Sequence, residues 1–342
     1  MTVYPLFRAL LFKLDPERAH QLTLRLIHLA GDIKPVNGLL RRAFSVPGQP
    51  VRAFGLTFSN PVGLAAGYDK DGLGWRGLAS LGFGHIEIGT VTPKPQAGNP
   101  KPRVFRLISD KALINRMGFP GLGEDFVKRE ITKTRTGNLV LGVNIGKNKD
   151  TPLESADQDY LQLLRAFAAY ADYLTINISS PNTIGLRQLQ ASQALDHLLG
   201  LISVERERLQ LSLTKKIPIL VKLAPDLSDD QLDDALEVLL TQKMDGVIAT
   251  NTTLSRDSIT SLLASESGGL SGPPLFSRSL DMVGKIYQRT SGRLPVIGVG
   301  GIYNATGAQK MLDAGAVLLQ IYTGLIYEGP GLVKRILQDL RK

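Results

Sequence analysis

The chain has 342 residues, of which 43% are hydrophobic and 21% are charged, so it can bury a core for one large domain or two smaller ones. Its 40 Lys and Arg residues against 31 Asp and Glu residues give a net charge of +9, which favours anionic partners such as phosphate-bearing cofactors, acidic metabolites, lipid headgroups or nucleic acid. There is no cysteine, which excludes disulfides, thiolate nucleophiles, and zinc or iron–sulfur clusters held by cysteine.

The first 45 residues differ from the rest in charge and in apolar pattern. They hold seven Lys or Arg and three Asp or Glu, and seven minus three is a net charge of +4. Residues 5–14 are apolar nearly all round and predict a short helix. Asp15 followed by Pro16 and an acidic residue is typical of a helix start, with Asp15 as the N-cap. We therefore predict two helices here, followed by a linker over residues 34–52.

Two interpretations of these helices remain open. They form either a helical hairpin packed on the main domain or a foot in the membrane interface, with basic residues at its rim. Arg8, Lys13, Asp15 and Glu17 interrupt the apolar stretch, and no run of about 18 uncharged apolar residues occurs. The sequence therefore predicts neither a secretory signal nor a membrane-spanning helix.

Residues 53–342 alternate between short β-type runs and amphipathic stretches such as 157–171, 229–241 and 304–314, which is the pattern of βα units. The runs that we expect to be strands are Val62–Ala65, His85–Ile88, Val140–Asn144, Tyr173–Ile178, Ile219–Leu223, Gly246–Thr250, Val296–Val299 and Val317–Ile321. They predict an α/β fold, a (β/α)₈ TIM barrel, with residues 1–45 as a two-helix extension. The alternative is an open doubly wound sheet, which usually has fewer strands.

Polar and glycine-rich residues follow each predicted strand, at the end where such a barrel carries its chemistry. Asn144, Asn177 and Asn251 offer neutral, fixed hydrogen bonds to a polar planar ligand. The glycine loops at 298–301 and 322–324 follow the last two strands. Because glycine lets backbone N–H groups approach an anion, these loops predict a phosphate site.

Two lysines, Lys70 and Lys222, stand where barrel strands end. Burying an unpaired ammonium is costly, so an inward lysine is seldom structural. Two roles stay open for them: a Schiff-base nucleophile, or a fixed cation opposite developing negative charge. The four histidines show no ligand spacing, and the sequence predicts no metal site.

Several motifs, in order along the chain, resemble those of dihydroorotate dehydrogenases. They are Ala66-Gly67-Tyr68-Asp69-Lys70, Ile88-Gly89-Thr90-Val91-Thr92-Pro93, Asn115-Arg116-Met117-Gly118-Phe119, Gly142-Val143-Asn144-Ile145-Gly146-Lys147-Asn148, Asn177-Ile178-Ser179-Ser180-Pro181-Asn182-Thr183, Lys222-Leu223-Ala224-Pro225-Asp226-Leu227 and Thr250-Asn251-Thr252. The resemblance spans residues 4–336. It implies an FMN-containing (β/α)₈ barrel that oxidises dihydroorotate to orotate in pyrimidine biosynthesis.

Two features resemble the membrane-associated, quinone-reducing branch of that family, called class 2. That branch uses a serine as its catalytic base where class 1 uses cysteine, and this chain has Ser180 and no cysteine. Class 2 members also carry a two-helix extension that lies on the membrane and guides quinone to the flavin, and residues 4–31 are similar to it. Tyr68 departs from the Leu or Phe that is usual there.

The resemblance implies a role for each matching residue. Ser180 would take the proton from C5, with a relay through Thr183. Residues implied in substrate binding are Lys70, Asn115, Arg116, Met117, Gly118, Phe119, Asn177, Asn182, Asn251 and Thr252. Residues implied in FMN binding are Ala66, Gly67, Tyr68, Asp69, Lys70, Thr90, Asn144, Asn177, Lys222, Thr250, Gly272, Gly301, Tyr322 and Thr323. His20, Arg103 and Tyr322 are implied at the quinone site.

The implied partners are dihydroorotate and orotate, a membrane quinone, and an anionic lipid surface under the N-terminal helices. We expect one FMN per chain, no metal, no iron–sulfur cluster and a monomer at the cytoplasmic face of a bacterial cell membrane. Nucleic acid is not expected, because no basic patch interleaved with aromatics occurs. Three alternatives stay open: an FMN barrel acting on another dihydropyrimidine, a Schiff-base lyase using Lys222, and a lipid-surface binding protein without catalysis.

Overall fold

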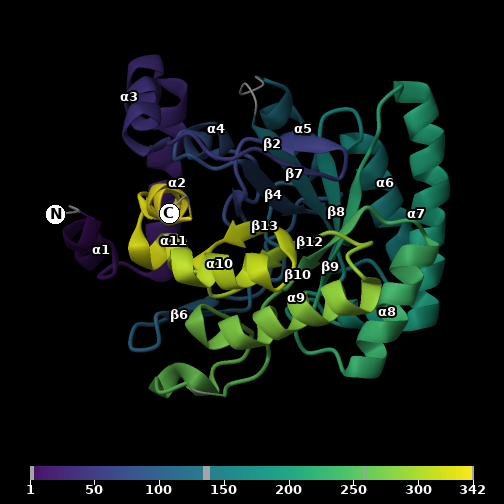
Figure 1. Cartoon of the computed structure of the whole chain (residues 1–342). Coiled ribbons are helices and arrows are strands. Elements are labelled where there is room, and N and C mark those ends of the chain that lie inside the picture. The colour runs from purple at the N-terminus through teal and green to yellow at the C-terminus, as the bar shows by residue number, and fades with distance from the viewer. Residues whose placement is uncertain (1–3, 134–138, 258, 341–342) are drawn as a thin grey trace.

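The computed structural model describes residues 4–133, 139–257 and 259–340. Its centre is a closed barrel of parallel strands that follow one another in chain order, the last pairing with the first (Figure 1). The barrel strands are β3 (Val62–Leu64), β4 (His85–Val91), β7 (Val140–Ile145), β8 (Tyr173–Asn177), β9 (Ile219–Leu223), β10 (Gly246–Ala249), β12 (Val296–Val299) and β13 (Ala316–Ile321). The predicted TIM barrel is confirmed, and the open sheet is excluded.

The barrel strands are buried on both faces, which explains why they appear in the sequence as short apolar runs. Apart from half-buried Val317 on β13, every residue of these strands is buried. Helices cover the outer face, and side chains fill the inside. All of the predicted strands are present, and the largest difference is β4, which continues from the predicted end at Ile88 to Val91.

Helices surround the barrel on its outside (Figure 1). They are α4 (Trp75–Ala79), α5 (Glu124–Thr132), α6 (Ala156–Phe167), α7 (Ser192–Leu213), α8 (Asp229–Thr241), α9 (Phe276–Thr290), α10 (Ala305–Asp313), α11 (Thr323–Glu328) and α12 (Leu332–Asp339). The helix α8 begins with a capping box, in which Ser228 and Gln231 exchange side-chain and backbone hydrogen bonds. The side chain of Asn304 caps α10. These caps account for the agreement with the predicted stretches 229–241 and 304–314.

Two small sheets lie outside the barrel and were not predicted. The hairpin of β1 (Val51–Ala53) and β2 (Leu56–Phe58) is antiparallel. A second antiparallel sheet joins β5 (Val104–Leu107), β6 (Ala112–Asn115) and β11 (Gly269–Ser271). This second sheet brings Asn115 beside residue 269 from a distant part of the chain. Strands of three or four residues carry too short an alternation for the sequence to reveal them.

The N-terminal helices lie together at one side of the barrel (Figure 1). The helices α1 (Tyr4–Leu11) and α2 (Pro16–Asp32) match the prediction, and Asp15 caps α2 by accepting hydrogen bonds from the backbone N–H groups of Glu17 and Arg18. The predicted linker over 34–52 is wrong for its first part, which forms α3 (Lys34–Phe44). Pro35 stands in the first turn, where proline is tolerated, and Leu40 and Phe44 form a half-buried stripe one helical turn apart.

One face of α2 packs closely on the barrel. A Cβ on Gly77 of α4 would come within 2.0 Å of the Ile27 carbonyl oxygen, so the two helices approach to backbone contact. Arg103, before β5, makes a two-pronged ion pair with Glu17, at 2.7 and 3.1 Å. The N-terminal helices are therefore attached to the barrel through α2.

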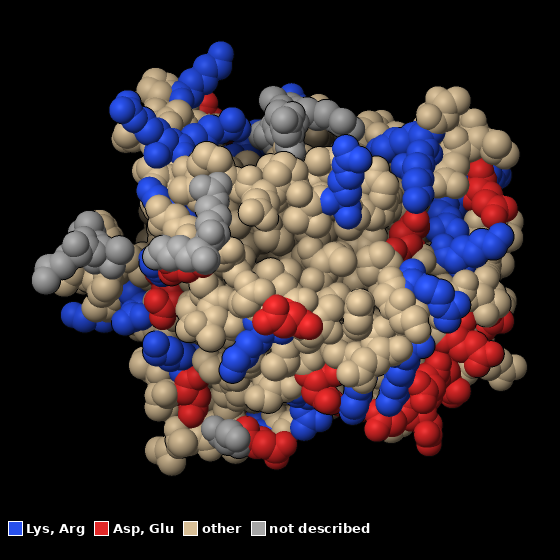
Figure 2. Space-filling model, viewed as in Figure 1, with Lys and Arg blue, Asp and Glu red and all other residues tan. Residues whose placement is uncertain are grey.

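The other face of these helices is apolar and exposed. The exposed side chains are Leu6, Phe7 and Leu10 on α1, Leu22, Leu26 and Leu29 on α2, and Leu39 on α3. Figure 2 shows Lys and Arg side chains around this side of the molecule, whereas Asp and Glu side chains gather over α8 on the opposite side. Among the described residues, no helix has the length and apolar character needed to cross a membrane.

Candidate active site

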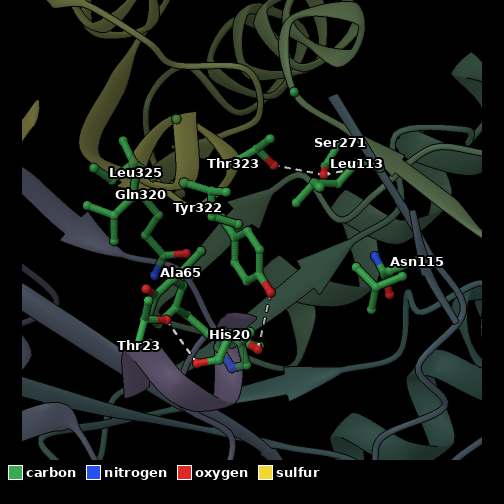
Figure 3. Close-up of a pocket in the computed structure, with 18 of the residues that line it drawn as sticks. His20, Thr23, Ala65, Leu113, Asn115, Ser271, Gln320, Tyr322, Thr323 and Leu325 are labelled. Carbon is green, nitrogen blue, oxygen red and sulfur yellow. Dashed lines mark hydrogen bonds between the residues drawn. The ribbon is translucent and has the colours of Figure 1, made fainter. Parts of the chain in front are cut away.

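A cavity of about 580 Å³ lies at the carboxyl ends of the barrel strands and continues to the N-terminal helices. Its barrel end is lined by polar residues, namely Lys70, Thr90, Asn115, Asn177, Ser180, Asn182, Lys222, Asn251 and Thr252. Its other end is lined by mostly apolar residues of α1 and α2, among them Phe7, Leu11, Leu26 and Ile27. Figure 3 shows residues from both ends, with His20 on α2 and Tyr322 and Thr323 at the end of β13.

Ser180 lies in the loop after β8 and lines the cavity, with 5% of its surface exposed. Its Oγ accepts a hydrogen bond from the backbone N–H of Asn182 at 3.2 Å. The Asn182 amide in turn donates to Asn115 Oδ1 at 3.1 Å. The Oγ1 of Thr183 is buried and has no hydrogen-bond partner in the described part of the chain. A nucleophile or base and two amides therefore share one wall of the cavity.

Arg187 ties this loop to the neighbouring strand ends. Its guanidinium donates to the carbonyl oxygen of Ser179 at 3.0 Å and to that of Thr252 at 2.9 Å. It also forms an ion pair with Asp226 at 2.8 Å. The residues after β8, β9 and β10 are thereby held as one unit around Ser180.

The two predicted lysines both reach the cavity. Lys222 on β9 is 5% exposed, and its burial lowers the pKa of its ammonium, while the negative charge of Glu87 partly opposes that shift. Burial also lowers the pKa of Lys70 to about 8, against the opposing charges of Asp71 and Glu17. The Lys70 ammonium donates to the Gly67 carbonyl oxygen at 2.5 Å. An anion that binds beside either lysine would stabilise its charged form and offset the effect of burial.

Glycines after β12 and at the start of α11 let the chain pack closely on itself at one end of the cavity. Gly301 has φ +66°, and a Cβ there would meet Phe276 Cβ at 2.7 Å. A Cβ on Gly324 would meet the Ile302 carbonyl oxygen at 2.4 Å. Beside them, the hydroxyls of Thr323 and Ser271 lie 2.8 Å apart (Figure 3). This end of the cavity offers hydroxyls and backbone N–H groups, which suit a phosphate.

Aromatic side chains join the two ends of the cavity. The ring of Tyr68 lies edge-on to His20, with 5.0 Å between centroids, and to Tyr322 at 5.8 Å. Burial, with a smaller contribution from Lys70, lowers the pKa of His20 to about 4. His20 is therefore neutral near pH 7 and can accept or donate one hydrogen bond there.

The family model for dihydroorotate dehydrogenase matches residues 50–342. The chain belongs to the dihydroorotate dehydrogenase family. Dihydroorotate dehydrogenase (quinone) of Edwardsiella ictaluri is 49% identical to it over 338 residues, which cover 98% of this chain and 99% of the relative. The corresponding protein of Yersinia pseudotuberculosis is 50% identical with the same coverage.

Solved structures of the same family have the same fold. The dihydroorotate dehydrogenase of Eimeria tenella in complex with ferulenol superposes with a TM-score of 0.87 at 40% identity, covering 95% of this chain and 90% of that one. Its ligand-free form superposes with a TM-score of 0.86 at 39% identity, covering 95% and 94%. The match includes nearly the whole chain.

Most residues that the sequence singled out for a site of this family line the cavity. Besides the polar residues named above, they are Ala66, Gly67, Tyr68, Met117, Gly118, Phe119, Thr250, Gly272, Gly301, Tyr322, Thr323 and His20. Five do not line it: Asp69, Arg103, Arg116, Asn144 and Thr183. Asp69 accepts hydrogen bonds from the backbone N–H groups of Leu73 and Gly74 instead. Arg103 pairs with Glu17, and Arg116 pairs with Glu266 at 2.6 Å.

Several cavity residues escaped the sequence analysis. Gln320 and Ser271 line the barrel end, and Tyr4 and Thr23 line the helical end. Gln320 is the one polar residue within the apolar run 317–321, and Glu87 is a charged residue between Ile86 and Ile88 in the interior of β4. A polar side chain inside a buried strand must find partners, so this was the signal in the sequence that could have revealed both.

Within the described residues, no group of three or more His, Asp or Glu side chains is arranged to hold a metal ion.

Proposed function

We propose that this chain oxidises dihydroorotate to orotate in pyrimidine biosynthesis, with FMN as its prosthetic group and a membrane quinone as electron acceptor. The relatives that share 49 and 50% of its sequence are named dihydroorotate dehydrogenase (quinone). One observation carries the proposal: a single cavity joins the polar end of the barrel to the apolar helices α1 and α2. Such a cavity serves an enzyme that takes a polar substrate at one end and an apolar acceptor at the other.

The residues at the barrel end fit a flavin mononucleotide. Gly301, Thr323 and Ser271 would hold the phosphate, and Gly67 and Thr90 would border the ring system. Lys222 would face the ring edge on which reduction places negative charge. A bound flavin would supply a hydride acceptor for C6 of dihydroorotate and an electron donor for the quinone.

Ser180 would remove the C5 proton of the substrate. A serine hydroxyl is a weak base unless its own proton can leave, so it needs a relay. Thr183 fits this relay because its buried hydroxyl has no partner among the described residues. The amides of Asn115, Asn177, Asn182 and Asn251, with Thr252, would bind the carboxylate and ring edges of dihydroorotate and fix its orientation.

The quinone would enter between α1 and α2. Phe7, Leu11, Leu26 and Ile27 offer an apolar path there, and neutral His20 stands with Tyr322 where that path meets the barrel. Arg103 does not line this path, and we propose that it anchors α2 through Glu17. The quinone class is membrane-associated, and we further propose a monomer at the cytoplasmic face of a bacterial membrane, attached by its exposed apolar face to anionic lipid.

Anaerobic titration tests the proposed reaction. Dihydroorotate should bleach the flavin absorbance of the purified protein, and a quinone should restore it. Full bleaching by another dihydropyrimidine but not by dihydroorotate would identify a different substrate. A colourless protein that borohydride links to a carbonyl compound at Lys222 would support the lyase instead.

The charge of Lys222 should matter more than its volume. Lys222→Met is expected to weaken FMN retention and to slow flavin reduction by about 10²–10³-fold, because a positioned cation opposite developing charge is lost. Flavin content and stopped-flow reduction measure the two effects.

Lys147 provides a matched control. It is 2% exposed, donates to the carbonyl oxygens of Asn148 and Thr151 at 3.1 and 2.8 Å, and does not line the cavity. Lys147→Met should lower the melting temperature while the reduction rate of the folded enzyme stays normal. Equal effects of the two substitutions on flavin reduction would mean that Lys222 is only structural.

A further inference from the structure

Glu87, in the middle of β4, is a carboxylate that the reaction described above does not use. It is fully buried inside the barrel. Burying a charge is costly unless hydrogen bonds compensate it, and four donors surround this one. Asn144 Nδ2 donates to one carboxylate oxygen at 2.8 Å. Tyr173, Thr175 and Gln320 donate to the other oxygen, at 3.1, 3.1 and 3.0 Å.

The carboxylate determines which way the Asn144 amide faces. An ionised carboxylate only accepts hydrogen bonds, so the NH₂ of Asn144 must point toward Glu87. The Asn144 carbonyl oxygen then points toward the cavity wall. There it accepts from Thr90 Oγ1 at 2.6 Å and from Asn177 Nδ2 at 3.1 Å.

The orientation of the Asn144 amide also fixes the orientation of the side-chain amides of Asn177 and Asn251, through the hydrogen bonds between them. Because the NH₂ of Asn177 faces Asn144 and Thr90, its Oδ1 faces Asn251, whose Nδ2 lies 3.3 Å away. The Oδ1 of Asn251 in turn accepts from the backbone N–H of Thr252 at 2.8 Å. Asn177, Asn251, Thr90 and Thr252 all line the cavity. We call Asn144, Asn177 and Asn251 the amide row.

We propose that Glu87 is a positioning residue: its carboxylate sets the direction of the amide row and so decides which donors and acceptors face the flavin and the substrate. The inference rests on the proposed function for the identity of those ligands. The coupling between Glu87 and Asn144 is a contact between two protein side chains, so it does not depend on which ligands bind.

A charge swap tests this coupling. In Asn144→Asp, two carboxylates face each other where a donor met an acceptor, so the pair must hold a proton to stay in contact. In the double variant Glu87→Gln, Asn144→Asp, the amide NH₂ of residue 87 can donate to the carboxylate at 144. The other oxygen of that carboxylate still accepts from Thr90 and Asn177. The double variant thus keeps every donor and acceptor, and the total charge.

The melting temperature of the full chain should follow this pattern. Asn144→Asp should lose stability as the pH rises from ~4 to ~9, because the two facing carboxylates raise the pKa of the pair above its unfolded value, and the proton that they share is lost as the pH passes that raised pKa. The double variant should follow the wild type across that range. The other titratable groups around Glu87 are His85 on its own strand, Tyr173 on β8 and Lys222 on β9, and they are the same in all three proteins.

FMN binding gives a second readout. At ~pH 8, Asn144→Asp should bind FMN about tenfold or more weakly than the wild type, and the double variant should recover most of that loss. If the swap restores the melting temperature but none of the proteins, the wild type included, binds FMN, then Glu87 sets the row and the proposed cofactor is wrong. If the double variant is no better than Asn144→Asp in either measurement, Glu87 does not set the direction of the row.

Tyr173→Phe is the matched control. It removes one donor from the far oxygen of Glu87 and leaves the contact with Asn144 in place. It should lower the melting temperature without changing FMN affinity. A loss of FMN affinity equal to that of Asn144→Asp would show that general loosening of the barrel interior explains the effect, and would overturn the inference.

Discussion

Ser180→Ala is expected to slow the reduction of the flavin by dihydroorotate by about 10²–10⁴-fold, the contribution usual for a positioned general base. The flavin should stay bound, because the residues that would hold its phosphate, Gly301, Thr323 and Ser271, lie on other strand ends. The loss should appear in the reduction step measured by stopped flow under anaerobic conditions. Reoxidation by quinone should be unchanged, because it does not involve the C5 proton.

Ser271 offers a control within the same cavity. Its hydroxyl lies at the end that we assign to the phosphate, 2.8 Å from the hydroxyl of Thr323. Ser271→Ala should weaken FMN binding and leave the reduction rate of the flavin-loaded enzyme near normal. If Ser180→Ala shows this pattern instead, or reduces flavin at a normal rate, another group is the base.

The barrel could be predicted because each of its strands leaves a pattern in a short stretch of sequence. Each strand is buried on both faces, so it appears as an apolar run, and the polar residues after it mark its carboxyl end. Residues 34–44 and the sheet of β5, β6 and β11 lacked such a signal. Lys34-Pro35, with Pro47 and Pro50 further on, suggested a linker, but Phe44 of α3 packs on a core surface that only the folded chain supplies.

The sequence predicted which residues lie near the candidate site better than it predicted how their side chains are oriented. A motif shows that a side chain is near a strand end, but its orientation depends on partners from elsewhere in the chain. Arg116 lies next to cavity residues and yet turns to Glu266, 150 positions away in the sequence. Asp69 satisfies the backbone of the following turn. The role of Glu87 could not be predicted in this way, because it lies inside β4 and not at the end of a strand.

The structure also bears on the two interpretations of the N-terminal helices, because each describes one face of them. The inner face of α2 packs on α4 and is attached through Glu17 and Arg103. The outer face is apolar and exposed. Removing the whole segment would therefore uncover the barrel, and substitutions confined to the outer face are the cleaner test of membrane attachment.

The double variant Leu6→Glu, Leu10→Glu makes that test. Both side chains lie on α1, are 71% and 63% exposed, and do not line the cavity. If they insert into lipid, each loses the transfer free energy of a buried leucine, about 1.5–3 kcal/mol, so binding to anionic vesicles should fall about 10²-fold or more. Turnover with a long-tailed quinone held in those vesicles should fall with it. Turnover with a small soluble acceptor dye and the melting temperature should stay near the wild-type values.

The helix α7, on the side of the barrel away from α1 (Figure 1), supplies the matched control. Val204 and Leu211 are 70% and 82% exposed, so Val204→Glu, Leu211→Glu adds the same charge to an equally exposed apolar pair. This variant should keep vesicle binding and both activities, because only the N-terminal face is proposed to meet the membrane. If vesicle binding falls equally in the two double variants, the added negative charge and not the loss of an apolar contact with lipid explains the effect. Equal losses with both acceptors in the α1 variant would mean that α1 supports the barrel and that quinone reaches the flavin by another path.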